Sequence, residues 1–122
     1  MLQEICLALA IYHEARGEPT AGKHAVAEVV VNRAETRKKD FCDIVFERNQ
    51  FSWTRNSRWK QHHKDEKSWQ DSLRIANLHL NGSPTNYTKG SEYFCSSSMN
   101  MSRAWGARKM ATIGSHTFYK KL

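Results

Sequence analysis

The strongest constraint on the fold is a break at Gly17 and Pro19, which separates two stretches of helical periodicity. Apolar residues recur at helical spacing before the break and predict a helix over residues 2–16. Gly and Pro then end that helix, and Thr20 can cap a second helix over residues 21–35. The core-facing residues expected from the second helix are Ala25, Val26, Val29, Val30 and Arg33.

The middle of the chain predicts less regular structure, followed by a third long helix. Asp43 could cap a short turn of helix that ends at Phe46, and residues 47–64 show no period and are expected to form a loop. Asp65 is expected to start a helix that ends near Leu80, before Asn81 and Gly82. The apolar face expected on this helix consists of Trp69, Leu73, Ala76 and Leu80.

The last part of the chain carries strand-forming residues. Residues 92–95 and 112–119 predict two strands that pair antiparallel, joined by a loop around Trp105. No repeat, low-complexity segment or Gly- and Pro-rich linker divides the chain, so residues 1–122 are expected to form one domain. The fold class is therefore α+β, mostly helical, with a small antiparallel sheet.

Charge and cysteine content narrow the class of protein. The net charge of +7 favours a polyanionic partner, such as nucleic acid or an anionic bacterial envelope. The odd number of widely spaced cysteines, Cys6, Cys42 and Cys95, argues against a disulfide framework and a zinc ribbon. We expect three reduced thiols, as in a protein made in the cytosol, and we expect no signal peptide.

The segment YHEARGEP, residues 12–19, carries the most unusual chemistry. Glu14 lies near the end of an apolar helix, where burial can raise the pKa of a carboxyl towards that of a general acid, with His13 and Arg16 close enough to tune it. Glu18 follows four residues later, and this spacing suggests the paired carboxylates of a glycosidase. Spacing alone favours two solvated residues at a helix end. Because Pro19 disfavours helix at Glu18, that residue is more simply expected to accept N–H groups at the start of the second helix.

Two later segments offer substrate-binding groups. In NQFSWT, residues 49–54, polar Gln50 and Ser52 alternate with Phe51 and Trp53, a pattern that suits sugar rings; alternatively, the aromatics hold a loop on the core. In TIGSHTFY, residues 112–119, His116 could orient a substrate, although a lone histidine is more often structural. Metal-ligand spacings and phosphate loops are absent, so no metal or cofactor is expected.

In their order along the chain, these segments resemble the catalytic domain of the SleB/CwlJ-type cell wall hydrolase family. The matching stretches are LALAIYHEARGEP, AGKHAVAEVVVNR, QFSWT, KGSEYF, Trp105 and TIGSHTFY. The resemblance implies a distantly lysozyme-like α+β domain that acts on peptidoglycan, with Glu14 as its catalytic acid. The residues expected to line the substrate site are Gln50, Phe51, Ser52, Trp53, Tyr93, His116 and Tyr119. Many family members carry His where this chain has Cys95, which leaves position 95 without an assigned role.

For SleB-like members the resemblance implies lytic transglycosylase activity, which needs one acid/base group and yields a 1,6-anhydro sugar. The chain also looks like a globular phage endolysin, a monomer made in the host cytoplasm that reaches periplasmic peptidoglycan after release by a holin. A bacterial autolysin fragment is the alternative origin. Within enzymes, the alternatives are a muramidase that uses Glu18 or an N-acetylmuramoyl-L-alanine amidase. The non-enzyme alternative is a basic nucleic-acid-binding domain, although no nucleic-acid motif is present and no specific nucleic acid is expected.

Overall fold

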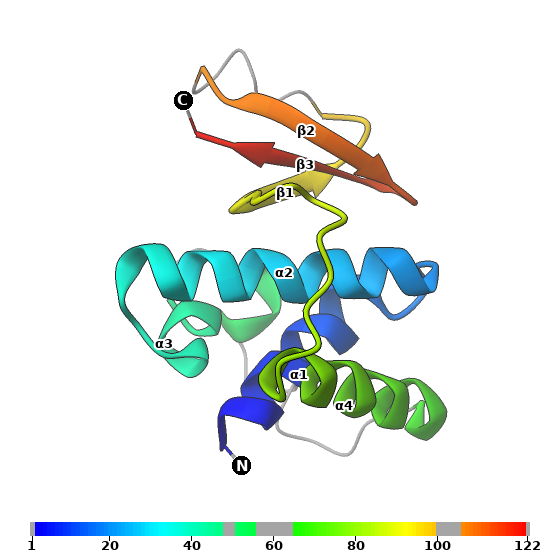
Figure 1. The fold of residues 1–122 in the computed structure, drawn as a ribbon. Helices are drawn as coiled ribbons and strands as arrows, with labels where there is room; N and C mark the ends of the chain where they lie inside the picture. Colours follow the sequence, from blue (N-terminus) through cyan, green and yellow to red (C-terminus); the bar gives the residue numbers. More distant parts are fainter. Residues whose placement is uncertain (1, 48–50, 56–64, 100–105, 122) are drawn as a thin grey trace.

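The computed structural model describes residues 2–47, 51–55, 65–99 and 106–121. Four α-helices come first, followed by a small sheet, which confirms the predicted α+β class (Figure 1). The elements in chain order are α1 (Leu2–Ala15), α2 (Thr20–Arg37), α3 (Phe41–Val45), the 3₁₀ turn η1 (Ser52–Arg55), α4 (Glu66–Leu80), β1 (Tyr93–Ser96), β2 (Arg108–Ile113) and β3 (His116–Lys120). Among the described helices, none is long and apolar enough to cross a membrane.

Helix α2 is the centre of the fold, with the sheet on one side and α1, α3 and α4 on the other (Figure 1). Ala27 and Val30 belong to the main helical core, whereas Ala25 and Val29 pack with Phe118 of the sheet. The five core-facing residues predicted for this helix are all buried, which confirms them. Burial on two sides explains why β-branched valines are accepted in a helix, since tertiary packing outweighs weak propensity.

The helix ends differ in detail from the prediction. Pro19, not Thr20, is the N-cap of α2, and it provides no side-chain hydrogen bond. The expected cap of the short third helix was also wrong, because Asp40 caps α3 by accepting from the backbone N–H of Asp43. Asp65 caps α4 as expected, by accepting from the Ser68 N–H. Of the predicted apolar face, Ala76 is buried and Trp69 and Leu73 pack partly buried against the core, whereas Leu80 is 36% exposed. Ser72 and Ile75 are buried as well.

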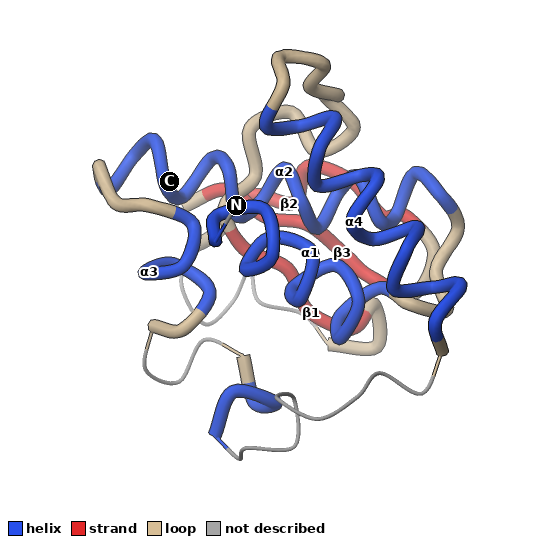
Figure 2. Tube along the Cα trace, turned by 90° about the horizontal axis from the view of Figure 1, so that it is seen from below, coloured by secondary structure: helices blue, strands red, loops and turns tan. Residues whose placement is uncertain are grey.

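The sheet has the strand order β1-β3-β2, and both pairings are antiparallel. Cys95 lies opposite Thr117, which confirms the predicted pairing of the two segments. The prediction of one continuous strand over residues 112–119 was wrong, since that segment contains the β2–β3 turn. Gly114 makes the turn with a φ of 58°, in the left-handed region that glycine adopts most easily. Figure 2 shows the three strands behind the helices when the molecule is seen from below.

A buried carboxylate fixes the connection between α4 and β1. Glu28 of α2 is 4% exposed, and one of its oxygens accepts from the backbone N–H of Thr88 at 2.9 Å and from the Thr88 hydroxyl at 2.7 Å. The other oxygen accepts from the Tyr87 N–H at 2.9 Å. These hydrogen bonds compensate the burial of the charge and hold the connection against α2.

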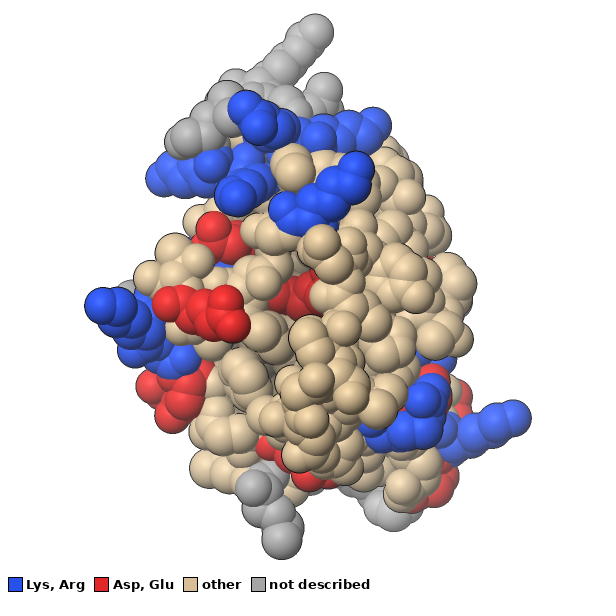
Figure 3. Space-filling view, viewed as in Figure 1, with Lys and Arg blue, Asp and Glu red and all other residues tan. Residues whose placement is uncertain are grey.

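Surface charge is unevenly distributed. Figure 3 shows Lys and Arg side chains gathered over the end of the molecule that carries the sheet, above a face with few charges. The exposed basic residues of this region are Lys89, Arg108, Lys109, Lys120 and Lys121.

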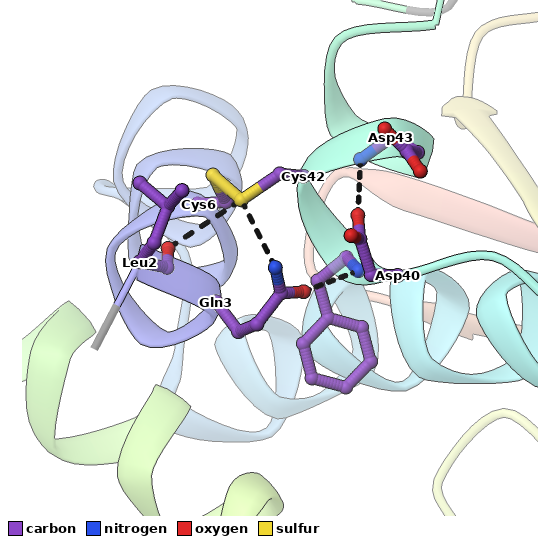
Figure 4. Close-up of a disulfide and its surroundings, with 7 residues drawn as sticks. Leu2, Gln3, Cys6, Asp40, Cys42 and Asp43 are labelled. Carbon is purple, nitrogen blue, oxygen red and sulfur yellow. Dashed lines mark hydrogen bonds between the residues drawn. A yellow bond between two sulfur atoms is a disulfide. The ribbon is translucent and has the colours of Figure 1, made fainter.

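A disulfide between Cys6 of α1 and Cys42 of α3 corrects the expectation of three reduced thiols (Figure 4). The packing of α3 against α1 brings the two Cα atoms to 5.2 Å, inside the range that a disulfide spans. Gln3 supports the junction, because its Oε1 accepts from the Phe41 N–H at 2.7 Å. Cys95 is the free cysteine, so the three cysteines form one disulfide and leave one thiol.

Candidate active site

Glu14 lies in the last turn of α1, one residue before the helix ends at Ala15. The helix is almost entirely buried along its apolar length, and this burial places the Glu14 side chain in a half-buried position. Desolvation raises the pKa of Glu14, and a hydrogen bond from the Trp53 side chain opposes part of that rise. The net direction is upward, so a larger share of this carboxyl is protonated than of an ordinary glutamate, as a general acid requires.

Trp53 of η1 stands beside the end of α1. Its ring stacks on the His13 ring with centroids 4.4 Å apart and planes 22° from parallel. It also meets Phe46 edge-on at 5.9 Å and remains partly accessible. Trp53 therefore contacts both His13 and Glu14 at the end of α1.

The remaining residues of NQFSWT divide into different roles. Phe51 is 4% exposed and belongs to the main helical core, so it anchors the segment instead of presenting a ring at the surface. Ser52 is exposed, and the Thr54 hydroxyl donates to the Phe51 carbonyl at 2.7 Å, which stabilises the turn. Gln50 lies outside the described residues.

A row of ring contacts joins Trp53 to the sheet. Phe51 lies 6.0 Å from Trp53 and 6.2 Å from Phe94 of β1, measured between ring centroids. Phe94 in turn meets His116 of β3 edge-on at 5.0 Å. His116 is thereby placed at the far end of this row, where burial lowers the pKa of its imidazole.

Glu18 binds the β2–β3 turn and not the start of α2, which corrects the expected partner. Its carboxylate accepts from the Ser115 backbone N–H at 2.8 Å and from the Ser115 hydroxyl at 2.6 Å, and the His116 Nδ1 is 3.8 Å away. Burial alone would raise the pKa of Glu18, but the Ser115 hydrogen bonds and His116 hold it below its ordinary value. A side chain at Gly114 would place Cβ 2.2 Å from Glu18 Oε1, so the turn fits the carboxylate closely.

The two tyrosines expected to line the substrate site, Tyr93 and Tyr119, make other contacts. The Tyr93 hydroxyl accepts from Arg37 at 3.4 Å, and the Arg33 guanidinium lies 5.6 Å from the Tyr93 ring centroid. Tyr119 is 2% exposed, so it is a core residue, and direct contact with a substrate would require exposure that it does not have. Arg16, expected to tune Glu14, donates to the Tyr12 hydroxyl at 2.9 Å.

Sequence reasoning missed Ser115 as the partner of Glu18. The Gly-Ser dipeptide at residues 114–115 is a turn signal inside an otherwise strand-like run, and it could have identified both the hairpin and the exposed Ser115. It could not have identified Glu18, which is 97 residues away in the chain. Within the described ranges, no group of three His, Cys, Asp or Glu side chains is placed to hold a metal ion.

Comparison with known proteins identifies the family of this chain. The model of the family described as Cell Wall Hydrolase matches residues 17–119, a range that begins just after Glu14. The catalytic domain of the germination-specific lytic transglycosylase SleB from Bacillus anthracis is similar, with 25% identity and a TM-score of 0.74 over 97% of this chain and 93% of that one. The catalytic domain of Bacillus cereus SleB is also similar, with 27% identity and a TM-score of 0.70 over 98% and 91% of the two chains. No curated protein matches the chain.

The family match covers most of the chain, and the two similar structures share its helical body and its small sheet. The chain belongs to the cell wall hydrolase family and is an enzyme that cleaves peptidoglycan.

Proposed function

We propose that this enzyme is a lytic transglycosylase that cleaves the bond between N-acetylmuramic acid and N-acetylglucosamine, with Glu14 as its acid and base. The observation that carries the proposal is the contrast between two carboxylates. Glu14 is half-buried with a raised pKa, whereas the Glu18 carboxylate accepts two hydrogen bonds from Ser115. One proton-transferring carboxyl suffices for a transglycosylase, and the similar SleB domain from Bacillus anthracis belongs to a lytic transglycosylase.

In the proposed reaction, protonated Glu14 donates its proton to the glycosidic oxygen as the bond to C1 of the muramic acid breaks. Positive charge develops at C1 in an oxocarbenium-like transition state. The C6 hydroxyl of the same sugar attacks C1, and the Glu14 carboxylate takes the proton of that hydroxyl. The products are a chain end with a 1,6-anhydro sugar and a free hydroxyl on the leaving sugar. Because the nucleophile belongs to the substrate, its proximity replaces a positioned water.

We further propose that Trp53 and Ser52 contact the glycan beside Glu14, and that Gln50 contributes from the same segment. The partial accessibility of Trp53 and its stacking against His13 support this placement. Phe51 would act by holding the segment on the core. His116 and Tyr93 stay candidates for the outer parts of the site.

The natural setting that we propose is lysis of a Gram-negative host by a phage, with the enzyme acting on periplasmic peptidoglycan after holin-type release. The disulfide between Cys6 and Cys42 supports action outside the cytosol, since such bonds persist in oxidising compartments. Clearing of outer-membrane-permeabilised Gram-negative cells at micromolar protein would agree with this setting. Folded protein that leaves the turbidity of such a suspension unchanged would refute it.

Mass spectrometry of muropeptides released from purified sacculi tests the reaction directly. The proposal expects anhydro-muropeptides from the wild-type protein and none from Glu14→Gln. Reducing ends without anhydro sugars would identify a muramidase and return Glu18 to consideration as a second carboxylate. Released stem peptides with intact glycan strands would identify an amidase.

A further inference from the structure

The basic side chains at one end of the sheet come from three separate segments, and together they are here called the basic patch. It consists of Lys89, Arg108, Lys109, Lys120 and Lys121, all exposed. Arg108 of β2 lies directly opposite Lys120 of β3 in the strand register, so their side chains share one face of the sheet. Lys109, the next residue along β2, points to the other face, so the patch extends around this end of the sheet. The Lys120 Nζ is 3.6 Å from where a Cβ of Gly90 would be, which places Lys89 beside the same end of the sheet. Figure 3 shows this concentration of positive charge.

The basic patch has no counter-charge among the residues that the structure describes. Across the described part of the chain, none of its members forms an ion pair, whereas Lys23, Arg33 and Arg37 each do. The backbone N–H of Glu92 donates to the Tyr119 carbonyl at 3.1 Å, and among the described residues the Glu92 carboxylate forms no ion pair. Like charges directly opposite in an antiparallel pair destabilise the sheet. An anion bound across Arg108 and Lys120 would remove that repulsion.

The basic patch lies at the end of β3 away from His116, which is a candidate for the outer part of the site. The strand begins at His116, next to Glu18, and ends at Lys120. At about 3.3 Å per residue, four steps along a strand separate the two ends by about 13 Å. One extended polymer could therefore contact both ends of this strand.

We propose that the basic patch binds carboxylates of the peptide stems of peptidoglycan and thereby docks the enzyme on the wall while Glu14 acts on the glycan. This inference rests on the proposed function, because the stems are attached to the strand that Glu14 would cleave. Lysine and arginine form charge-assisted hydrogen bonds with carboxylates, and each exposed contact is weak. Repeated stems would present many such contacts at once, so the docked state gains from multivalency.

Binding to purified sacculi, measured by co-sedimentation with the inactive Glu14→Gln protein, tests the docking without cleavage. Lys109→Glu with Lys120→Glu changes the basic patch, and Lys38→Glu with Lys67→Glu is the matched control. Both control residues are exposed, outside the patch, and free of ion pairs within the described residues. The two double variants lower the net charge equally. At low salt we expect at least tenfold weaker binding for the patch variant and less than threefold for the control, and the difference should disappear at high salt.

Sacculi whose carboxylates have been converted to neutral amides identify the partner. Wild-type binding should fall to the level of the patch variant, and the patch variant should lose nothing further. Equal losses in the patch and control variants would overturn the proposal in favour of a general charge effect. Binding to amidated sacculi at the original strength would overturn it as well. Patch-dependent binding to anionic phospholipid vesicles or to DNA, without binding to sacculi, would assign the surface to a membrane or to nucleic acid instead.

Cleavage of peptide-free glycan chains separates this inference from the proposed function. The patch variant should cleave such chains at the wild-type rate, since no member of the patch belongs to the candidate active site. If wild-type protein cleaves no glycan but still shows patch-dependent binding to sacculi, the proposed function fails and docking stands. If the Glu variant misfolds, Lys109→Gln with Lys120→Gln replaces it, and an unchanged affinity of that variant for sacculi overturns the docking.

Discussion

The surroundings of two glutamates four residues apart in the chain shift their pKa values in opposite directions. Glu14 loses solvent at the end of a buried helix, and the pKa of its carboxyl rises. Glu18 gains two hydrogen bonds from Ser115, and the pKa of its carboxyl falls. Environments that separate the pKa values of two carboxyls are a recognised way to assign different roles to them. At the scale of single residues, the candidate acid is thus distinguished by its environment and not by its type.

Glu14→Gln should abolish cleavage, whereas Glu18→Gln should keep most of the wild-type activity. Glutamine has nearly the shape of glutamate but cannot transfer a proton to the leaving oxygen, and general acid–base catalysis contributes about 10²–10⁴-fold. Rates of anhydro-muropeptide release check both variants. A Glu14→Gln protein with a near wild-type rate would contradict the mechanism, and an inactive but stable Glu18→Gln protein would support a two-carboxylate hydrolase.

The same substitution should change how stability depends on pH. Because the folded-state pKa of Glu14 is raised, its contribution to stability is complete below the unfolded pKa and is lost as pH rises through the folded pKa. Glutamine does not titrate, so Glu14→Gln should gain stability relative to wild type as pH rises through that window. Melting temperatures at pH 4 and pH 7 measure this gain. A variant that becomes relatively less stable at pH 7 would show that the buried charge is favourable.

Trp53→Ala should reduce turnover of sacculi more than it reduces the free energy of unfolding, since Trp53 is partly accessible beside Glu14. Phe51→Ala is the control, because Phe51 is fully packed in the helical core. Truncating a buried Phe costs about 3–5 kcal/mol, so this variant should lose stability first. Denaturant unfolding and initial rates measure both effects. If Trp53→Ala unfolds as readily as Phe51→Ala, Trp53 is a core residue.

At the scale of secondary structure, periodicity was sufficient for the helices and insufficient for the sheet. The patterns of α1, α2 and α4 span many turns, so their existence and approximate ends follow from the sequence. The caps of α2 and α3 were misplaced, because several polar residues near each end could serve and only the folded backbone selects one. The β2–β3 hairpin was missed because strand-forming residues continue across its turn. The partner that makes this turn necessary is Glu18, at a distance that no local pattern reveals.

Ser115→Ala should lower the free energy of unfolding by about 1.5–3 kcal/mol, the range for hydrogen bonds to a charged group. Gly114→Ala should cost more, since it combines a positive φ with a 2.2 Å approach to Glu18. Because the folded-state pKa of Glu18 is lowered, its stabilisation is present above the unfolded pKa and is lost as pH falls through the folded pKa. The difference between wild type and Ser115→Ala should therefore shrink in acid, as denaturant titrations at pH 3 and pH 7 can show. A difference that does not depend on pH would mean that the hydroxyl acts without the charged carboxylate.

At the scale of the whole molecule, fold class and family could be predicted, whereas the way the helices are tied together could not. The composition and element order indicate a mostly helical domain with a late sheet. The central position of α2 depends on contacts between segments far apart in the chain, which no single-sequence pattern contains. The disulfide illustrates this limit, since counting cysteines favoured free thiols, and only the packing of α3 on α1 brings Cys6 and Cys42 together.

Breaking that disulfide should lower the stability of the whole domain. The bond joins residues 36 apart, and the chain-entropy model gives about 4 kcal/mol for a loop of that length. Measured effects are typically about 2–4 kcal/mol, so Cys42→Ser should lower the melting temperature by about 10 °C in a domain of this size. Cys95→Ser is the matched control, because Cys95 is free. Reductant should lower the melting temperature of wild type and of Cys95→Ser, and should leave Cys42→Ser unchanged. If reductant has no effect on wild type, the bond contributes nothing to stability, and its support for action in an oxidising compartment is lost.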